Sequence, residues 1–254
     1  MILTIDAGNT RTKWAIFNDA NAVIAHGAFN NVELTSSPAQ WADCDLVVIS
    51  NVAGDAVAVK LKAMLSPTVR QHWVSATESG FGICNRYEQP ERLGCDRWAA
   101  MVGARQYAGQ SCLVVNAGTA LTIDALLREP ATNSHVFAGG VIIPGWHLMR
   151  QALLQGTQGI QPALTENKAG TYVDLPTNTE DAIYTGALLA MTGAIEHMSM
   201  RLQRQADEAI HCMLGGGDAR LLAERLAGSA VISDIVVIED LVLRGLLVIG
   251  REIK

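Results

Sequence analysis

One short strand–turn–strand pattern occurs in both halves of the chain, and this repetition constrains the fold more than any other feature. Near the N-terminus an apolar run ends on Asp6. A glycine-containing turn, polar side chains and a second apolar run follow it, up to Phe17. The same order returns over residues 112–126, where residues 115–119 align with residues 5–9 at a constant offset. Such a repeat indicates a duplication at domain scale, although chance similarity between two short units is the alternative.

The segments around the repeat predict alternating strands and helices, which is typical of an α/β protein. We expect hairpins over 1–17 and 112–126, and strands over 21–27, 45–51, 71–74, 209–213 and 231–238, with a further strand reaching 139–146. We expect helices over 54–65, 95–105, 146–154, 179–205, 219–226 and 239–251, with 77–93 and 155–178 irregular. Thr179 is predicted to cap the long helix. The duplication predicts two domains, residues 1–110 and 111–254.

Composition excludes several classes of protein. A chain of 254 residues with a net charge of −6 and no basic tract is not expected to bind nucleic acid through its phosphates. No run approaches the roughly 18 apolar residues of a membrane span, so no membrane partner is expected. The five cysteines have no metal-ligand spacing and predict reduced thiols in a cytoplasmic protein. There is neither a P-loop motif nor the Gly-x-Ser-x-Gly elbow of a hydrolase.

The first hairpin turn has the chemistry of a phosphate site. Gly8 lets the backbone turn sharply and approach a ligand closely. Successive N–H groups in such a turn bind anions, and Asp6 beside them is suited to hold a hydrated divalent metal. The alternative is an ordinary hairpin turn, which Asn9 and Gly8 also favour.

Two further segments add to this interpretation. Asp96 lies in the first turn of a predicted helix, where the helix dipole favours its ionised form, and it is the best candidate for a general base. Arg97 beside it suits bidentate capture of a carboxylate or phosphate, although a capped helix with a surface arginine is the commoner outcome. Cys95 is expected to line the site without acting as a nucleophile. The triple glycine 215–217 is a weak signal alone, but in this company it favours nucleotide binding.

The motifs together resemble those of the type III pantothenate kinases, the first enzymes of coenzyme A synthesis in many bacteria. They are Asp6-x-Gly8-Asn9-Thr10, Tyr87-x-x-Pro90-x-x-Leu93-Gly94-x-Asp96-Arg97-Trp98, Ala117-Gly118-Thr119-Ala120-x-Thr122-x-Asp124, Gly139-Gly140-x-Ile142-x-Pro144-Gly145 and Asn178-Thr179-x-x-Ala182-Ile183-x-x-Gly186. The resemblance implies two duplicated ribonuclease-H-like domains of the acetate/sugar kinase–Hsp70–actin type, with a nucleotide cleft between them. It also implies a homodimer and transfer of the γ-phosphoryl group of ATP to the primary hydroxyl of pantothenate.

The resemblance also assigns roles by position. Asp6, Ala7, Gly8, Asn9, Thr10, Arg11, Thr12 and Lys13 form the first phosphate loop, with Asp6 holding Mg²⁺. Thr119 contacts ATP phosphates, and Gly215, Gly216 and Gly217 lie on the adenosine side. Asp96 is the proton acceptor, and Tyr87, Gly94, Cys95, Asp96, Arg97 and Thr179 bind pantothenate, with Arg97 as the partner of its carboxylate.

One residue departs from the family pattern. Asn116 stands where the family commonly has an Asp associated with a monovalent cation such as K⁺ or NH₄⁺. An amide keeps an oxygen ligand but removes a full charge, so a cation there is less well compensated. Two other functions stay open at the level of sequence. One is a kinase of another small hydroxyl substrate, and the other is a non-catalytic nucleotide-binding regulator.

Overall fold

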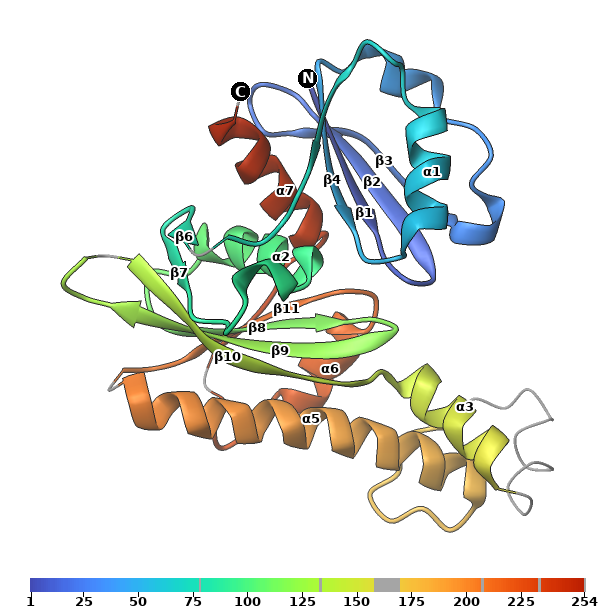
Figure 1. Cartoon of the computed structure of the whole chain (residues 1–254). Helices are drawn as coiled ribbons and strands as arrows, with labels where there is room; N and C mark the ends of the chain where they lie inside the picture. The colour runs from blue at the N-terminus through green and yellow to red at the C-terminus, as the bar shows by residue number, and fades with distance from the viewer. Residues whose placement is uncertain (78, 133, 158–169, 207, 233, 254) are drawn as a thin grey trace. The chain divides into compact units, whose positions relative to one another are not determined.

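The computed structural model describes residues 1–77, 79–132, 134–157, 170–206, 208–232 and 234–253 (Figure 1). These residues pack into two compact units. Unit 1 comprises Met1–Gly109, Leu126–Gly139 and Glu239–Lys254, and unit 2 comprises Gln110–Ala125 and Gly140–Ile238. The division after residue 110 stays a prediction about domains, and each packing unit is described by itself.

Unit 1 contains a five-stranded sheet in the order β3-β2-β1-β4-β5. Its strands are β1 (Ile2–Ala7), β2 (Arg11–Phe17), β3 (Val23–Asn30), β4 (Leu46–Asn51) and β5 (Arg70–Trp73). β1, β2 and β3 pair antiparallel as a meander, whereas β1, β4 and β5 run parallel. All five lie where the sequence predicts strands, with ends that shift by a few residues.

Side-chain alternation along β1 sends successive residues to opposite faces of this sheet. Leu3 and Ile5 belong to a buried cluster with Leu61 of α1 (Asp55–Met64). The other face meets α7 (Leu241–Glu252), where Ile2 lies beside Gly250. Figure 1 shows α1 and α7 on the two faces of the sheet. By the same alternation, Asp6 points toward the α7 face.

Helix α2 (Cys95–Arg105) packs on α7 through glycine. A Cβ added to Gly245 would lie 1.7 Å from the carbonyl oxygen of Ala99, and one added to Gly103 would lie 2.7 Å from that of Leu241. The two helices therefore touch backbone to backbone. This contact fixes the start of α2 against the sheet, and that start carries Asp96.

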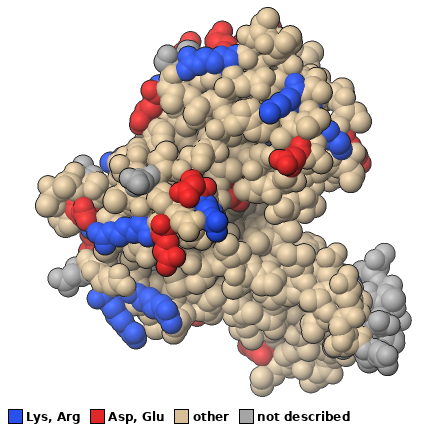
Figure 2. Space-filling model, viewed as in Figure 1, with Lys and Arg blue, Asp and Glu red and all other residues tan. Residues whose placement is uncertain are grey.

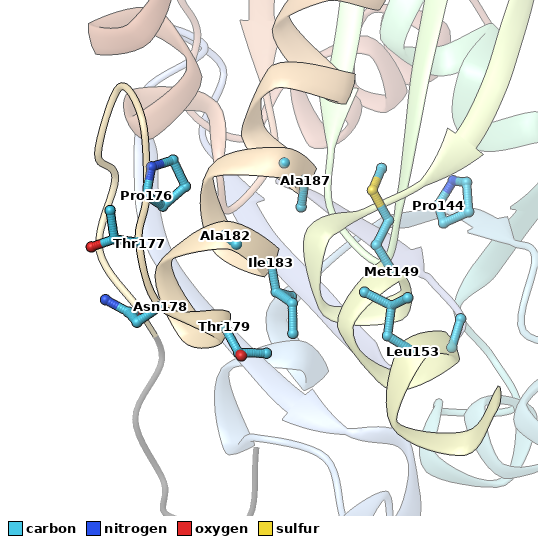
Figure 3. Close-up of a pocket in the computed structure, with 12 residues that line it drawn as sticks. Pro144, Met149, Leu153, Pro176, Thr177, Asn178, Thr179, Ala182, Ile183 and Ala187 are labelled. Carbon is cyan, nitrogen blue, oxygen red and sulfur yellow. The ribbon is translucent and has the colours of Figure 1, made fainter. Parts of the chain in front are cut away.

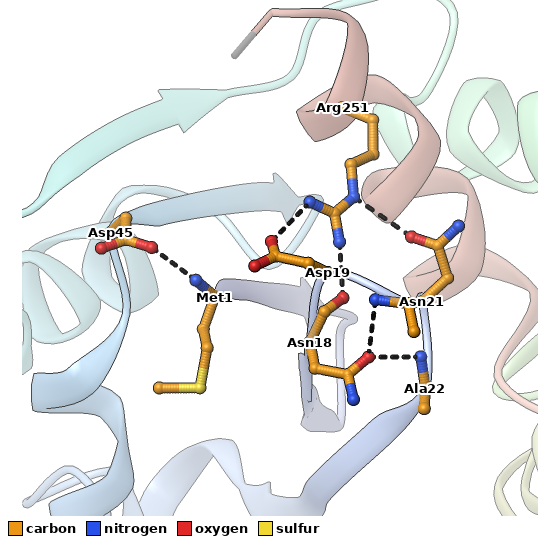
Figure 4. Close-up of polar contacts among 8 residues, drawn as sticks. Met1, Asn18, Asp19, Asn21, Ala22, Asp45 and Arg251 are labelled. Carbon is orange, nitrogen blue, oxygen red and sulfur yellow. Dashed lines mark hydrogen bonds and ion pairs between the residues drawn. The ribbon is translucent and has the colours of Figure 1, made fainter.

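Polar contacts tie the C-terminal helix to the β2–β3 turn (Figure 4). The Arg251 guanidinium donates to Asp19 and Asn21 at 3.2 and 3.1 Å and also to the carbonyl oxygen of Asn18. The N-terminal amine of Met1 pairs with Asp45. The Arg251 contacts hold α7 over the sheet at the end opposite Asp6.

A seven-stranded sheet has the order β12-β11-β8-β9-β10-β7-β6. Its strands are β6 (Ser79–Gly80), β7 (Ile83–Asn85), β8 (Cys112–Ala117), β9 (Ala120–Glu129), β10 (Ser134–Pro144), β11 (His211–Gly215) and β12 (Asp234–Val237). β9 and β10 contribute residues to both units. The order β10-β9-β8-β11-β12 repeats β3-β2-β1-β4-β5, and β1 and β8 share one burial pattern along their lengths. The duplicated α/β fold expected from the sequence is confirmed.

The described residues of unit 2 include the helices α3 (Trp146–Gly156), α5 (Thr179–Ala206) and α6 (Ala219–Leu226). The short 3-10 helices η1 (Asn31–Glu33), η2 (Ala39–Asp43) and η3 (Pro90–Arg92) belong to unit 1. The prediction of an irregular 77–93 was too coarse, because β6, β7 and η3 lie within it. Half of the predicted loop over 155–178 falls on residues 158–169, outside the described residues. Within the described ranges, no helix is both long and apolar enough to cross a lipid bilayer.

The predicted cap of the long helix is wrong by one residue. Helix α5 begins at Thr179, so Asn178 occupies the capping position, and its Oδ1 accepts the N–H of Asp181 at 2.9 Å. The Asn178 amide donates in return to the Asp181 carboxylate at 2.7 Å. These two reciprocal hydrogen bonds cap the N-terminus of α5 and leave the Thr179 side chain outside the cap.

Replacing Gly245 tests the α2–α7 contact. Gly245→Ala should lower the free energy of unfolding by about 3 kcal/mol or more, because the new methyl group meets a backbone carbonyl that cannot move alone. Chemical denaturation measures this loss. Gly156→Ala, at the end of α3 with open space around its Cα, is the matched control and should change stability by less than about 0.5 kcal/mol. An equal loss in both variants would contradict the described contact.

Candidate active site

The turn between β1 and β2 is braced by Asn31, a residue that the sequence did not single out. The Asn31 amide donates to the carbonyl oxygens of Gly8 and Asn9 at 2.7 and 3.1 Å. Its Oδ1 accepts the hydroxyl of the fully buried Thr12 at 2.8 Å. Thr12 therefore supports the turn through Asn31, on the buried side of the turn. The side chains of Asn9, Thr10 and Arg11 are exposed.

Asp6 sits at the end of β1 in an unfavourable electrostatic position. Burial and the charge of Asp96 raise the pKa of Asp6 to about 7; Asp240 adds to this effect, and Lys13 opposes it. Oδ1 of Asp6 is buried and has no hydrogen-bond partner among the described residues. A carboxylate with one buried oxygen that lacks a hydrogen-bond partner, beside a second carboxylate, attracts a cation.

These features fit a divalent metal at Asp6. Mg²⁺ prefers oxygen ligands and keeps most of its waters, so one or two carboxylates and substrate phosphates suffice to hold it. Within the described ranges, no cluster of three or more His, Cys, Asp or Glu side chains forms a protein-only metal cage. The structure therefore fits a metal held at Asp6 together with phosphate.

Asp96 lies in the first turn of α2, one residue after Cys95, as the sequence predicts. Its Oδ1 accepts the N–H of Arg97 at 2.8 Å and lies where a side chain on Gly94 would collide with it, at 2.6 Å from the added Cβ. The sequence predicts that the helix dipole favours the ionised form of Asp96, but burial has the larger effect on its pKa. Burial raises the pKa of Asp96 despite this hydrogen bond and the charge of Arg97. A raised pKa makes Asp96 a stronger base than an ordinary carboxylate.

Arg97 is buried, so the alternative of a capped helix with a surface arginine does not hold for this pair. It is 5% exposed, and its guanidinium carbon lies 5.7 Å from the centre of the Phe137 ring. The ring of Tyr87 stacks on Phe137 with centroids 6.1 Å apart and an interplanar angle of 18°. Tyr87, Arg97 and Phe137 are thus brought together within unit 1, two of them as the sequence predicted.

Cys95 lies inside the site as a protonated thiol. Its Sγ is 3.3 Å from the Ser50 hydroxyl, and Ser50 pairs in register with Asp6 across β1 and β4. Burial raises the pKa of the Cys95 thiol, so the helix start does not produce a reactive thiolate. The prediction that Cys95 lines the site without attacking substrate agrees with this environment.

In unit 2, the turn after β8 is packed between the starts of α3 and α6. The Gly145 N–H donates to the Thr119 carbonyl oxygen at 3.0 Å, and a Cβ on Gly145 would lie 2.2 Å from the Gly118 carbonyl oxygen. On the other side, a Cβ on Gly216 would lie 2.1 Å from the Ala117 carbonyl oxygen. Gly216 also has φ of +95°, which only glycine adopts without strain.

Several of the residues predicted to bind nucleotide lie in or beside this turn of unit 2. Asn116 pairs in register with Gly215, just as Asp6 pairs with Ser50 in the other sheet. Gly217 has no atom within 4 Å of the position of an added Cβ, so its backbone is open to a ligand. The start of α3 meets this turn at Gly118 and Thr119, and the glycine turn before α6 meets it at Ala117. Helix starts beside a glycine turn are suited to bind phosphate oxygens.

Thr179 lies in unit 2, at the edge of a pocket of about 950 Å³ between α3 and α5 (Figure 3). Apolar side chains from both helices line much of it, including Met149, Leu153 and Ile183. Thr177, Asn178 and Thr179 supply a polar rim. Thr179 is therefore described with this pocket and separately from the residues of unit 1.

Comparison with known proteins agrees with these features. The family model described as type III pantothenate kinase matches residues 2–201. A type III pantothenate kinase of Methylobacillus flagellatus is 40% identical over 249 residues, which covers 96% of each chain. One from Aromatoleum aromaticum is 40% identical over 256 residues and covers 99% of this chain and 98% of its own. The chain belongs to the type III pantothenate kinase family.

Solved structures place this member of the family in the actin-like ATPase and sugar kinase fold. A protein from Sinorhizobium meliloti, crystallised under the name 2-dehydro-3-deoxygalactonokinase, has a TM-score of 0.62 at 14% identity and covers 100% of this chain and 99% of its own. Component A of (R)-2-hydroxyglutaryl-CoA dehydratase from Acidaminococcus fermentans gives 0.54 at 12% identity, with the same coverage. At such identities the likeness shows the fold alone.

The pKa of Asp6 predicts how stability depends on pH. Because the native pKa of about 7 exceeds the ordinary 3.8, the native state retains a proton that the unfolded chain releases. Without metal or nucleotide, stability should therefore fall as pH rises from about 4 to about 7 and then level off. Asp6→Asn should reduce this fall, leaving the part that the raised pKa of Asp96 causes, and should raise the free energy of unfolding at pH 8 by about 1–3 kcal/mol.

Thermal or chemical unfolding at several pH values measures both effects. Asp55→Asn, at the exposed first turn of α1, is the matched control and should keep the wild-type pH profile. A pH-independent wild type, or an Asp6→Asn protein less stable than wild type at pH 8, would contradict the described environment.

Proposed function

We propose that this chain transfers the γ-phosphoryl group of ATP to the primary hydroxyl of pantothenate and so forms 4′-phosphopantothenate in coenzyme A synthesis. The observation that carries the proposal is the set of Asp6, Asp96 and Arg97 in unit 1. It combines a cation-attracting carboxylate, a base with a raised pKa and a buried guanidinium suited to a carboxylate. Pantothenate has the matching groups, one primary hydroxyl and one carboxylate.

Each group has one task in the proposed reaction. Arg97 binds the pantothenate carboxylate through parallel N–H donors. Asp96 accepts the proton of the hydroxyl as its oxygen bonds to the γ-phosphorus, and the bond from that phosphorus to the leaving oxygen of ADP breaks. Such a loose transition state needs mainly orientation and charge stabilisation, so one carboxylate suffices as base. Tyr87 and Thr179 complete the acceptor contacts.

The remaining predicted residues are assigned to ATP. Residues 6–13 and Thr119 contact its phosphates, and Gly215–Gly217 lie against adenosine. Asp6 and phosphate oxygens would hold Mg²⁺, which would supply positive charge against the phosphates. The Asn116 amide oxygen, with backbone carbonyls, is proposed as a weaker site for K⁺ or NH₄⁺.

The direct test is ADP release by the purified protein with a panel of small alcohols and hydroxy acids. The reaction contains Mg²⁺, with K⁺ and NH₄⁺ in separate series. We expect turnover with pantothenate above all other acceptors. Turnover confined to another acceptor would instead support a different small-molecule kinase. ATP binding without any turnover would support a regulator.

Asp96→Asn separates the base from the rest of the site. We expect kcat to fall by about 10²–10⁴-fold, because the amide cannot take the proton, while ATP affinity changes by less than about threefold. Steady-state kinetics and calorimetric ATP binding measure the two quantities. Asp55→Asn, another acid in a first helical turn but exposed, should keep wild-type kcat. Wild-type turnover in Asp96→Asn would remove this residue from the mechanism.

The exposed face of α5 supports the expected homodimer. Residues 182–195 contain no charged side chain, and Ala182, Gly186, Leu189, Ala190 and Gly193 are exposed along one side of the helix. An added Cβ at Gly186 or Gly193 would meet nothing within 4 Å, so packing inside this chain does not require glycine there. In the view of Figure 2, few charged side chains appear over α3 and the start of α5. We assign this face to a second copy.

A charge on this face should separate the copies. Leu189→Glu, at a side chain that is 53% exposed, should give a monomer in analytical ultracentrifugation where wild type gives a dimer. Val59→Glu on α1, at a side chain that is 67% exposed, is the matched control and should remain dimeric. A monomeric wild type would contradict the proposed dimer, and a dimeric Leu189→Glu would place the interface elsewhere.

We also propose a cytoplasmic location. The five cysteines are free thiols, and four of them are at least partly buried, which suits a reducing compartment.

A further inference from the structure

Phe137 lies between two residues of the proposed acceptor site, although the sequence gives no reason to select it. It is 1% exposed, and its ring contacts both the Arg97 guanidinium and the Tyr87 ring. All three residues belong to unit 1. We call them the Phe137 stack.

Strand pairing fixes the place of Phe137. β10 and β7 run parallel with Phe137 opposite Asn85, and the Asn85 Oδ1 accepts the N–H of Tyr87 at 3.0 Å. The Asn85 amide donates to the Thr77 carbonyl oxygen at 3.0 Å, so Asn85 is itself held in place. The backbone thus sets the distance from Phe137 to Tyr87 before any substrate binds.

An aromatic ring that packs against a guanidinium group restricts the orientation of that group. The cation is attracted to the face of the ring, whereas hydrogen bonds to a carboxylate form through the N–H donors in the guanidinium plane. Arginine otherwise has many rotamers, and each one lost in advance lowers the cost of binding a carboxylate. A leucine at position 137 would fill much of the same volume without offering this face.

We propose that Phe137 is a positioning residue that holds Arg97 for the acceptor carboxylate and so favours an anionic acceptor over a neutral one. This inference rests on the proposed function. It predicts that Phe137 lowers the KM for pantothenate without lowering that for a neutral acceptor, because only an acceptor with a carboxylate uses the positioned guanidinium.

The test compares pantothenate with pantothenol, in which a primary alcohol replaces the carboxylate, measured as substrate or as competitive inhibitor. In Phe137→Leu, the KM for pantothenate should rise about tenfold, with kcat changed less than about threefold. The KM or Ki of pantothenol should stay within about twofold. Phe137→Tyr keeps the aromatic face and should keep the pantothenate KM within about threefold of wild type.

Phe17→Leu is the matched control, because Phe17 is also fully buried in unit 1 but lies at the far end of β2 from the first turn. It should lose similar stability in thermal unfolding while keeping both acceptor constants. Equal weakening of pantothenate and pantothenol in Phe137→Leu, or an unchanged pantothenate KM, would overturn the inference. Failure of the proposed function is distinguishable, because wild type itself would then show no pantothenate-dependent ADP release.

Discussion

The site of unit 1 depends on the Asp6 carboxylate, one oxygen of which is buried and has no hydrogen-bond partner among the described residues. Strand alternation turns Asp6 away from the apolar cluster under α1 and toward the face where α2 begins, near enough to Asp96 for one charge to affect the other. A protein built only for stability would avoid this pair, since each charge raises the cost of the other. In the proposed function, a cation and phosphate are the compensating partners.

The rest of unit 1 serves to hold the two carboxylates at fixed positions. Glycines let α7 and α2 touch backbone to backbone, which fixes the N-terminus of α2. Gly94 lets the Asp96 carboxylate fold back over the helix start. Asn31 braces the turn that follows Asp6 from its buried side. In each case a small or amide side chain permits a close approach that a larger apolar residue would prevent.

Sequence patterns could predict the elements and the residues with distinctive chemistry. The alternation of β1 and the repeated Ala-Gly turn predicted the duplicated sheets, and the Asp96-Arg97 pair stood out at a helix start. Long-range partners could not be predicted in this way. Asn31 reaches the first turn from after β3, and Phe137 reaches Tyr87 through the register of β7 and β10. The burial that raises the pKa of Asp96 likewise depends on tertiary packing, whereas the helix dipole is a local property.

The most direct test of this account is the pKa of Asp6 itself, measured by carboxyl ¹³C NMR in the protein free of metal and nucleotide. Asp6→Asn would assign the signal. The account predicts a midpoint near the value of about 7, and a lower midpoint when Asp96→Asn removes the neighbouring charge. A midpoint close to the ordinary 3.8 in wild type, or one that does not move in Asp96→Asn, would contradict it.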